Sequence, residues 1–370
     1  MPPRLILFGA FDRHNFGDLL LGHCALAARP GRDTVFTGLA SRDLRAFDGH
    51  RVRALADVLA DHAREAADFV HVGGELLTTT AWEAAVMLQS SQAARAVVAA
   101  CDRQPIAREA WARRVLDCPR RLPYLVSAGA LPPRWRVHFD AVGGSGFAGL
   151  AAELQAEALA ALRGAATFSV RDRVTRDALA AAGLDARLVP DPAQRTRERF
   201  GQLIEARTAA GELAALRARM PDWIAVQIAA AWGDDATLAR LAQAVVGLAR
   251  DRGTGVVLFR AGLAPWHDDG EVLDRLAAQI AVAAPALPLA RLASVAVFDI
   301  CGLLAQARGY LGTSLHGWIV ARSFGVPARC LVEGAGAKAA CYIDTWNPDV
   351  VPGWVTLDGL ERGEGTFDEA

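Results

Sequence analysis

The stretch that most constrains the fold lies near the C-terminal end, from Gly309 to Pro327, and reads GYLGTSLHGWIVARSFGVP. A short apolar segment is followed by a turn of small polar residues. The apolar residues after that turn no longer alternate, and their spacing suits a helix packed on a sheet. Gly325 and Pro327 then end the helix in the usual order. The stretch therefore predicts a strand, a turn and a helix.

The turn of this stretch carries candidate site residues. Thr313, Ser314 and His316 fall at the expected helix N-terminus, where unpaired backbone N–H groups and the helix dipole favour an anion. A histidine there can hydrogen-bond a phosphate or carboxylate, or transfer a proton near neutral pH. The same residues fit a helix cap and a structural histidine equally well. From these residues alone both interpretations stay open.

The N-terminal end shows a similar pattern. Residues 4–9 form an apolar run that predicts a strand, and a helical segment follows the loop that contains Asn15, Gly17 and Asp18. Strand, glycine-containing loop and helix open a Rossmann-like unit, whose ligand side is the carboxyl end of the strand. The loop lacks G-x-G-x-x-G, so it does not indicate a dinucleotide site. It offers an amide, close backbone approach and a carboxylate, although these residues are also common in plain turns.

Two further strands end in residues that suit a ligand. The run 68–72 leads into Gly73 and Gly74, which let a ligand or another backbone segment approach closely. The run 167–170 leads into Arg171, whose guanidinium fits a carboxylate or phosphate. A tight turn and a salt bridge are the structural alternatives.

Other elements of the first half are expected from apolar patterning. We expect strands over 35–39 and over 124–129, the latter with a small-residue end that includes Ser127. We expect a mostly helical stretch over 42–59 and a helix over 82–100.

The chain divides into two series of strands and helices. At 370 residues it is too long for one ordinary core, so two domains are expected. Residues 194–220 are rich in charge and poor in strand features, and a new strand follows at 223–228. We predict an N-terminal domain over 1–200, a linker over 201–220, a C-terminal domain over 221–345 and a tail over 346–370.

Composition excludes several classes. A net charge of −1 gives no basic surface for general nucleic-acid binding. No apolar window reaches the length of a membrane span, and the N-terminus shows no signal-peptide pattern, so a cytoplasmic protein is expected.

The six cysteines contain no C-x-x-C pair, and we expect no metal site. His267 beside Asp268 and Asp269 is interpreted as a solvated loop rather than a metal or acid–base site. Lys338 is the only lysine among the 40 basic residues.

The order of these motifs resembles the polysaccharide pyruvyl transferase family. The segments that carry the resemblance are Asn15-Phe16-Gly17-Asp18, Val72-Gly73-Gly74, Phe168 to Asp172, Asp191-Pro192, and Ser314-Leu315-His316-Gly317 with Gly325-Val326-Pro327. The resemblance spans roughly residues 4–340. It implies an α/β fold with two Rossmann-like domains facing a cleft, similar to GT-B glycosyltransferases. It also implies transfer of the enolpyruvyl group of phosphoenolpyruvate to a sugar as a ketal, without a cofactor.

The resemblance assigns roles to individual residues. His316 matches the family's histidine and would donate a proton or bind phosphate, and Arg171 matches an arginine that would hold the donor. Asp18 completes the catalytic candidates. The remaining candidate contacts to substrate are Asn15, Gly17, Gly73, Gly74, Ser127, Thr313, Ser314 and Lys338.

The chain departs from the family pattern at two positions. Ser314 stands where many members have an arginine, and Glu75 stands where a third glycine is common. Both departures point to a changed donor, a changed acceptor or lost activity. Two other functions therefore stay open: a GT-B glycosyltransferase that uses a nucleotide sugar, and a non-catalytic protein that binds glycans or anions.

Overall fold

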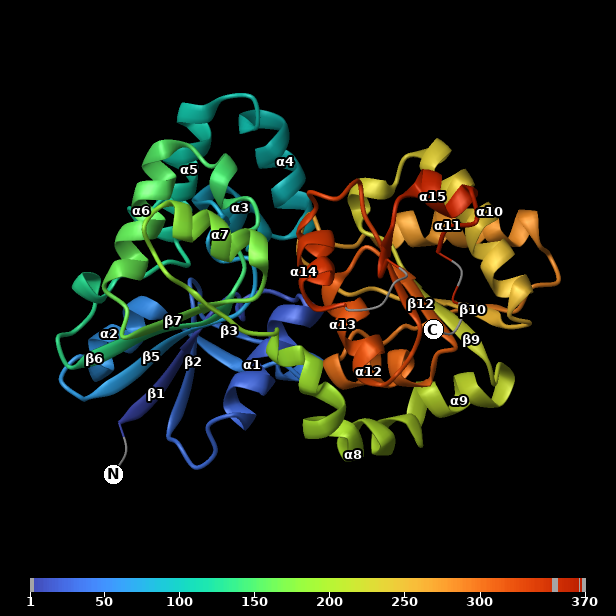
Figure 1. Ribbon diagram of the computed structural model, residues 1–370, viewed down its shortest axis with the longest axis horizontal. Coiled ribbons are helices and arrows are strands. Elements are labelled where there is room, and N and C mark those ends of the chain that lie inside the picture. Colours follow the sequence, from blue (N-terminus) through green and yellow to red (C-terminus); the bar gives the residue numbers. More distant parts are fainter. Residues whose placement is uncertain (1–2, 348–351, 366, 368–370) are drawn as a thin grey trace. The chain divides into compact units, whose positions relative to one another are not determined.

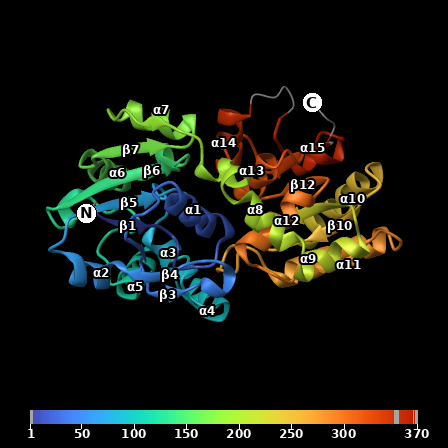
Figure 2. The same ribbon diagram turned by 90° about the horizontal axis from the view of Figure 1, so that it is seen from below.

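The structure is a computed structural model that describes residues 3–347, 352–365 and 367 (Figure 1). It separates into two compact units, Met1–Pro192 and Ala193–Ala370. Helices α8 (Thr196–Thr208) and α9 (Gly211–Arg219) occupy most of the linker expected from the sequence. They pack against α12 (Val297–Gln306) of the second unit (Figures 1 and 2). Within the expected tail, residues 348–351, 366 and 368–370 lie outside the described residues.

The first unit is built on a sheet whose described strands have the order β3-β4-β2-β1-β5-β6-β7-β8. Only the pairing of β3 with β4 is antiparallel among these described strands. Their bounds are β1 Arg4–Phe8, β2 Thr34–Gly38, β3 Arg42–Asp43, β4 Arg51–Ala54, β5 Ala67–Val72, β6 Trp135–Val142, β7 Thr167–Val170 and β8 Arg187–Leu188.

Helices connect these strands and cover the sheet. Their bounds are α1 Phe16–Ala27, α2 Leu55–His62, α3 Ala81–Met87, α4 Ser91–Cys101, α5 Pro105–Leu116, α6 Ala152–Arg163 and α7 Arg173–Ala181. Phe8 and Phe69 belong to the larger core cluster, together with apolar side chains of α2, α6 and α7. Leu7 and Val70 belong to a second cluster, with apolar side chains of α1. The alternation along β1 and β5 thus places α1 on the face opposite to α2, α6 and α7.

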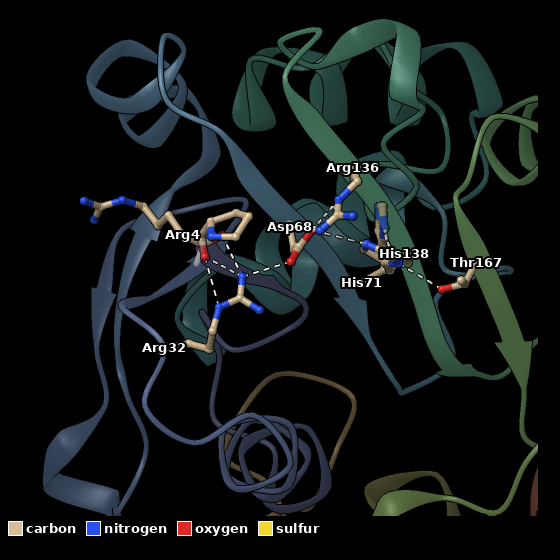
Figure 3. A network of polar contacts seen from close by, with 8 residues as sticks. Arg4, Arg32, Asp68, His71, Arg136, His138 and Thr167 are labelled. Carbon is tan, nitrogen blue, oxygen red and sulfur yellow. Dashed lines mark hydrogen bonds and ion pairs between the residues drawn. The ribbon is translucent and has the colours of Figure 1, made fainter. Parts of the chain in front are cut away.

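Strand β6 was missed by the sequence analysis. Val137 and Phe139 are buried in the core, whereas Arg136 and His138 point to the other face, where Asp68 of β5 accepts a hydrogen bond from Arg136 Nε at 2.9 Å (Figure 3). His138 Nδ1 lies 2.9 Å from the hydroxyl of Thr167 on β7. Apolar and polar residues therefore alternate, as expected for a strand with one polar face.

Three secondary-structure predictions for this unit are wrong. Residues 124–129 form no strand; Tyr124 is buried in the core, and the main-chain N–H of Val126 donates to His71 Nε2 at 3.0 Å. Residues 42–54 contain β3 and β4, because Val52 pairs with Phe36 of β2 and extends the sheet. Residues 82–100 form two helices, since the side chain of Ser90 caps α4.

The second unit has a parallel sheet whose described strands have the order β11-β10-β9-β12-β13-β14. Their bounds are β9 Trp223–Gln227, β10 Gly255–Leu258, β11 Leu289–Arg291, β12 Gly309–Gly312, β13 Ala328–Leu331 and β14 Trp354–Val355. Besides α8, α9 and α12, its described helices are α10 Asp235–Asp251, α11 Gly270–Ala283, α13 Leu315–Ser323, α14 Lys338–Trp346 and α15 Leu357–Glu361. Its core contains Val226 and Leu311 from adjacent central strands, packed with side chains of α10 and α11.

No helix within the described ranges has the length and apolar character needed to cross a membrane. The six cysteines all fall in those ranges, and none takes part in a disulfide bond. The described part of the chain contains no group of three or more His, Cys, Asp or Glu side chains that could hold a metal ion.

Candidate functional site

The predicted turn at 313–316 lies at the point where the strand order of the second sheet reverses. The chain leaves β9 on one side, towards β10 and β11, and returns to the other side of β9 as β12. In open parallel sheets the crevice at the carboxyl ends of two such strands is the usual ligand position. Here the residues at that position, which we call the crevice, are Gln227, the last residue of β9, and Thr313 and Ser314, which follow β12.

Helix α13 begins at this crevice because its sequence supplies the cap. Ser314 is the N-cap, and its hydroxyl accepts a hydrogen bond from Gly317 N at 3.2 Å. The buried hydroxyl of Tyr310 donates to Ser314 O at 3.0 Å. A Cβ atom on Gly312 or on Gly317 would come within 2.5 Å of that hydroxyl. Both glycines are therefore required by the packing around Tyr310.

Gln227 connects the two sides of the crevice. Its side-chain Oε1 accepts hydrogen bonds from Ser314 N at 2.8 Å and from the Thr313 hydroxyl at 3.3 Å. The Thr313 hydroxyl also accepts from Ala229 N at 2.9 Å. The hydroxyls of Thr313 and Ser314 thus have structural roles. His316, the second residue of α13, is partly exposed and lies on the same turn.

Two residues that the sequence analysis did not select lie beside this crevice. Asp268, in the loop before α11, accepts a hydrogen bond from Gln227 Nε2 at 2.7 Å. Burial of its carboxyl group raises the pKa of Asp268 to about 7. Arg260 follows β10, is partly exposed, and lowers the pKa of Asp268 by its positive charge. Arg260 could have been found from its position after a buried strand, and Asp268 from the run His267-Asp268-Asp269, which was interpreted as a solvated loop.

Lys338 is the first residue of α14 and is exposed. Its positive charge acts on Cys330 of β13, whose pKa burial nevertheless raises to about 12. Strand β13 is the neighbour of β12, and Lys338 begins the helix that follows β13 in the chain.

The first sheet has a corresponding reversal between β1 and β5. Asn15 caps α1, and its side chain accepts from Asp18 N at 3.1 Å. Gly73 and Gly74 follow β5 with φ angles of +43° and +73°. A Cβ on Gly74 would lie 3.1 Å from the Asp18 carboxylate. Gly17 and Asp18, which were expected in a loop, lie in the first turn of α1, and this turn meets the glycine pair, as their positions after the two strands predict.

A buried polar cluster supports this loop. Arg13 is 8% exposed, donates to the Tyr124 hydroxyl at 2.5 Å and lies 3.6 Å from the Asp18 carboxylate. The Tyr124 hydroxyl donates to Asp12, whose other carboxylate oxygen accepts from Leu39 N at 2.6 Å. Burial raises the pKa of the Tyr124 hydroxyl well above its usual value. The sequence analysis selected none of Arg13, Asp12 and Tyr124.

Arg171 is held by carboxylates of its own unit. Its guanidinium donates to Glu75 at 3.0 Å and to Asp191 at 3.1 Å, and its side chain is 4% exposed. Burial alone would lower the pKa of Arg171, but the charges of Glu75 and Asp191 outweigh it and raise the pKa. Glu75, which stands where a third glycine is common in the family, is thereby paired with Arg171. A donor could bind Arg171 only beside or in place of these carboxylates.

Ser127 precedes a short 3-10 turn over Ala128–Ala130 and is partly exposed.

The structure gathers most of the predicted residues into two groups, one in each unit. Thr313, Ser314 and His316 gather at the end of β12. Asn15, Gly17, Asp18, Gly73 and Gly74 gather at the ends of β1 and β5.

Comparison with known proteins decides the family. The model of the polysaccharide pyruvyl transferase family matches residues 141–333, more than half of the chain. The chain belongs to the polysaccharide pyruvyl transferase family. The resemblance inferred from its motifs is confirmed, and the chain is an enzyme of this family. Comparison with curated proteins gave no match.

Solved structures support the fold predicted for this pyruvyl transferase family enzyme. UDP-GlcNAc 2-epimerase from Methanocaldococcus jannaschii matches with a TM-score of 0.53 at 10% identity, over 99% of this chain and 92% of that chain. The enzyme of the same name from Rickettsia bellii matches with a TM-score of 0.52 at 11% identity, over 99% and 94%. The GT-B-like α/β prediction, with two parallel sheets, is thus confirmed.

The family match covers some candidate residues and leaves out others. Arg171, Arg260, Asp268, Ser314 and His316 lie within residues 141–333. The candidates of the first-unit loop, the glycine pair, Ser127 and Lys338 lie outside it.

Proposed function

We propose that this pyruvyl transferase family enzyme transfers the enolpyruvyl group of phosphoenolpyruvate to two hydroxyls of a sugar or glycan precursor. The product is a pyruvate ketal, and inorganic phosphate is released. The observation that carries the proposal is the family match over the segment that contains α13 and its His316.

The reaction sets clear chemical demands. Two hydroxyl oxygens bond to C2 of phosphoenolpyruvate, the bond from C2 to the phosphate oxygen breaks, and C3 gains a proton to become a methyl group. Of the two hydroxyl protons lost, one balances the new methyl proton and the other leaves with phosphate. The enzyme must therefore bind a trianionic donor, protonate a carbon and help a hydroxyl to attack.

The crevice of the second unit suits the donor. The start of α13 offers backbone N–H groups and the positive end of a helix dipole. His316 can exchange a proton at this position, and Arg260 brings a positive charge to the carboxyl end of the neighbouring strand β10. Ser314 caps the helix instead of supplying the second arginine that many family members have. In this proposal Arg260 and Lys338 supply positive charge in its place.

The acceptor is assigned to the first unit. Asn15 and Asp18, with the glycine pair that approaches Asp18, offer hydrogen-bonding groups of the kind that recognise sugar hydroxyls. Ser127 belongs to the same prediction. Arg171 has two possible roles. It holds Glu75 and the end of β7, or it binds the donor directly, and substitution of Arg171 distinguishes the two.

The test is donor-dependent phosphate release. Purified protein is incubated with phosphoenolpyruvate and a panel of sugar acceptors, and release is followed together with the mass of each acceptor. A pyruvyl ketal adds C₃H₂O₂ to the acceptor and consumes one phosphoenolpyruvate. Isothermal titration with phosphoenolpyruvate and with nucleotide sugars runs in parallel. Binding of nucleotide sugars alone would replace the proposal with a glycosyltransferase.

A further inference from the structure

The side chain of Asp268 makes two hydrogen bonds, one to the main chain of its own loop and one to the buried side chain of Gln227. Asp268 lies far from α13 in the sequence. Its Oδ2 accepts a hydrogen bond from Ala261 N at 2.5 Å, and its Oδ1 accepts from Gln227 Nε2 at 2.7 Å. Gln227 is 1% exposed, so water cannot replace Asp268 as the partner of its amide. Asp268 itself keeps partial exposure. The carboxylate therefore contacts the protein interior, while the residue keeps some exposure at the carboxyl edge of the sheet.

The amide of Gln227 transmits this contact to α13. Its Nε2 faces Asp268, and its Oε1 faces Ser314 N, the last N–H before the helix. These partners fix the orientation of the amide, since a flip would place two donors against each other at Ser314. Asp268 thus sets the position of the helix start through one intervening side chain.

The charges around Asp268 are few and come from three directions. Burial raises the pKa of Asp268, and the charge of Arg260 after β10 opposes that shift. Burial also raises the pKa of Tyr310 on β12, and the charge of Asp268 adds to that shift. His267 and Asp269 are its chain neighbours. Arg260 and Arg291 both approach Gly270, at 3.8 and 3.2 Å from the position of a Cβ on that glycine.

We propose that Asp268 is the positioning and proton-binding residue of the donor crevice: through Gln227 it holds the start of α13, and it takes up a proton when an anionic donor binds there. This inference rests on the proposed function, because it assigns the donor to the start of α13. It adds a residue and a proton that the family motifs do not assign.

The physical reason is linkage between two negative charges. An anion brought to the crevice raises the free energy of an ionised Asp268, so binding favours the protonated form. With its pKa at about 7, roughly half of Asp268 is ionised at neutral pH. Donor binding should then take up a fraction of a proton at pH 7, and this fraction should first increase as the pH rises above 7. Above pH 7 the affinity for phosphoenolpyruvate should fall by up to about tenfold per pH unit.

The key variant is Asp268→Asn, which cannot be ionised. An asparagine has one acceptor oxygen where Asp268 accepts from two N–H donors, so one of those contacts is lost. The matched control is Asp269→Asn. Asp269 caps α11 through its bond to Glu271 N at 2.9 Å, and asparagine is an equally good cap.

A second variant keeps the proposal testable if Asp268→Asn does not fold. In Arg260→Gln the positive charge that lowers the pKa of Asp268 is absent. The pH at which affinity begins to fall should then move upward, whatever happens to the affinity itself.

The experiment is isothermal titration with phosphoenolpyruvate at pH 6.5–8.5, in pairs of buffers with different ionisation enthalpies, which reports protons taken up per donor bound. We expect uptake in the wild type and in Asp269→Asn, and its loss in Asp268→Asn. Equal uptake in all three proteins, or a pH profile that Arg260→Gln does not move, would overturn the role of Asp268 and leave the proposed function standing. No binding of phosphoenolpyruvate by the wild type would overturn both.

Discussion

Replacement of Arg171 by methionine tests the most heavily buried ionic contact among the candidate residues. The Arg171 side chain is 4% exposed, Asp191 is fully buried and Glu75 is 21% exposed. Methionine fills much of the arginine's volume but leaves Asp191 without its positive charge. Removal of one partner from a buried ion pair costs about 3–5 kcal/mol, because the remaining charge stays desolvated. We expect a loss of this size in the first unit at pH 7.

The pH dependence of this loss follows from Asp191. In the variant, loss of the Arg171 charge raises the folded-state pKa of the buried Asp191, and we expect it to exceed the unfolded value of about 3.9. A raised folded pKa means that stability is present below the unfolded pKa and is lost as pH rises through the folded pKa. The variant should therefore be closest to the wild type near pH 4 and weakest above neutrality.

Hydrogen exchange of the amides in β6 and β7 measures this stability in the first unit alone, which a two-unit denaturation curve does not. The control is Arg176→Met on α7, where Arg176 and Asp177 are 39% and 64% exposed. Exposed pairs of this kind contribute about 0–1 kcal/mol. If Arg171→Met changes protection no more than this control, the argument from the buried carboxylates is refuted.

The same variant separates the two roles of Arg171. A purely structural role predicts an unchanged dissociation constant for phosphoenolpyruvate once the variant is folded. A direct contact with the donor predicts a loss of about 1.5–3 kcal/mol, the usual value of a hydrogen bond to a charged group. The double variant with Glu75→Gln gives a further check, because it removes one of the two carboxylates together with the cation.

Three further predictions concern other residues. Gly312→Ala should disrupt the start of α13 and abolish donor binding, since its Cβ would lie 2.5 Å from a backbone oxygen. The control Gly247→Ala has open space around its Cβ in α10. It should stabilise the protein by about 0.5–1 kcal/mol in thermal unfolding. His316→Asn should lower kcat by about 10²–10⁴ with little change in KM if the histidine transfers a proton; a rise in KM alone would make it a binding residue. Burial lowers the pKa of His71 to about 3, below its unfolded value of about 6.5, so the stability it contributes is lost as pH falls from 6.5 towards 3. In His71→Gln, the opening free energy of β5 and β6 measured by hydrogen exchange should fall less steeply between pH 7 and 4, and an unchanged slope would contradict this.

Apolar runs in the sequence were sufficient to predict the strands that are buried on both faces. The strands β1, β5, β9 and β12 lie at the centres of their sheets, and their largely apolar, buried runs identified them, although Asp68 and His71 interrupt the run of β5. Strand β6 has one polar face, so Arg136 and His138 interrupted its apolar run. Residues 124–126 have the opposite property: they are buried and apolar, but they pack under the sheet without joining it. Burial and strand pairing are separate properties, and apolarity reports only the first.

The candidate site divides along similar lines. Residues between a central strand and the start of the next helix, such as Asn15, Gly74 and Ser314, were found because position after a strand predicts the carboxyl edge of the sheet. Arg171 was also selected by position, yet its two carboxylate partners, Glu75 and Asp191, come from distant segments. Sequence position therefore predicts which edge of a sheet a residue occupies, but it does not predict which charges neutralise it.

Asp268 shows what strand order adds to such reasoning. Its loop follows β10, and in the sequence it lies far from both Gln227 and Ser314. Once β10, β9 and β12 are known to be neighbours, their carboxyl ends must lie side by side, because parallel strands end at the same edge. Asp268 was interpreted as part of a solvated loop because only its chain neighbours were considered. The sheet order instead gives it a buried amide as its partner and a pKa near 7, which is the property expected of a group that exchanges a proton at neutral pH.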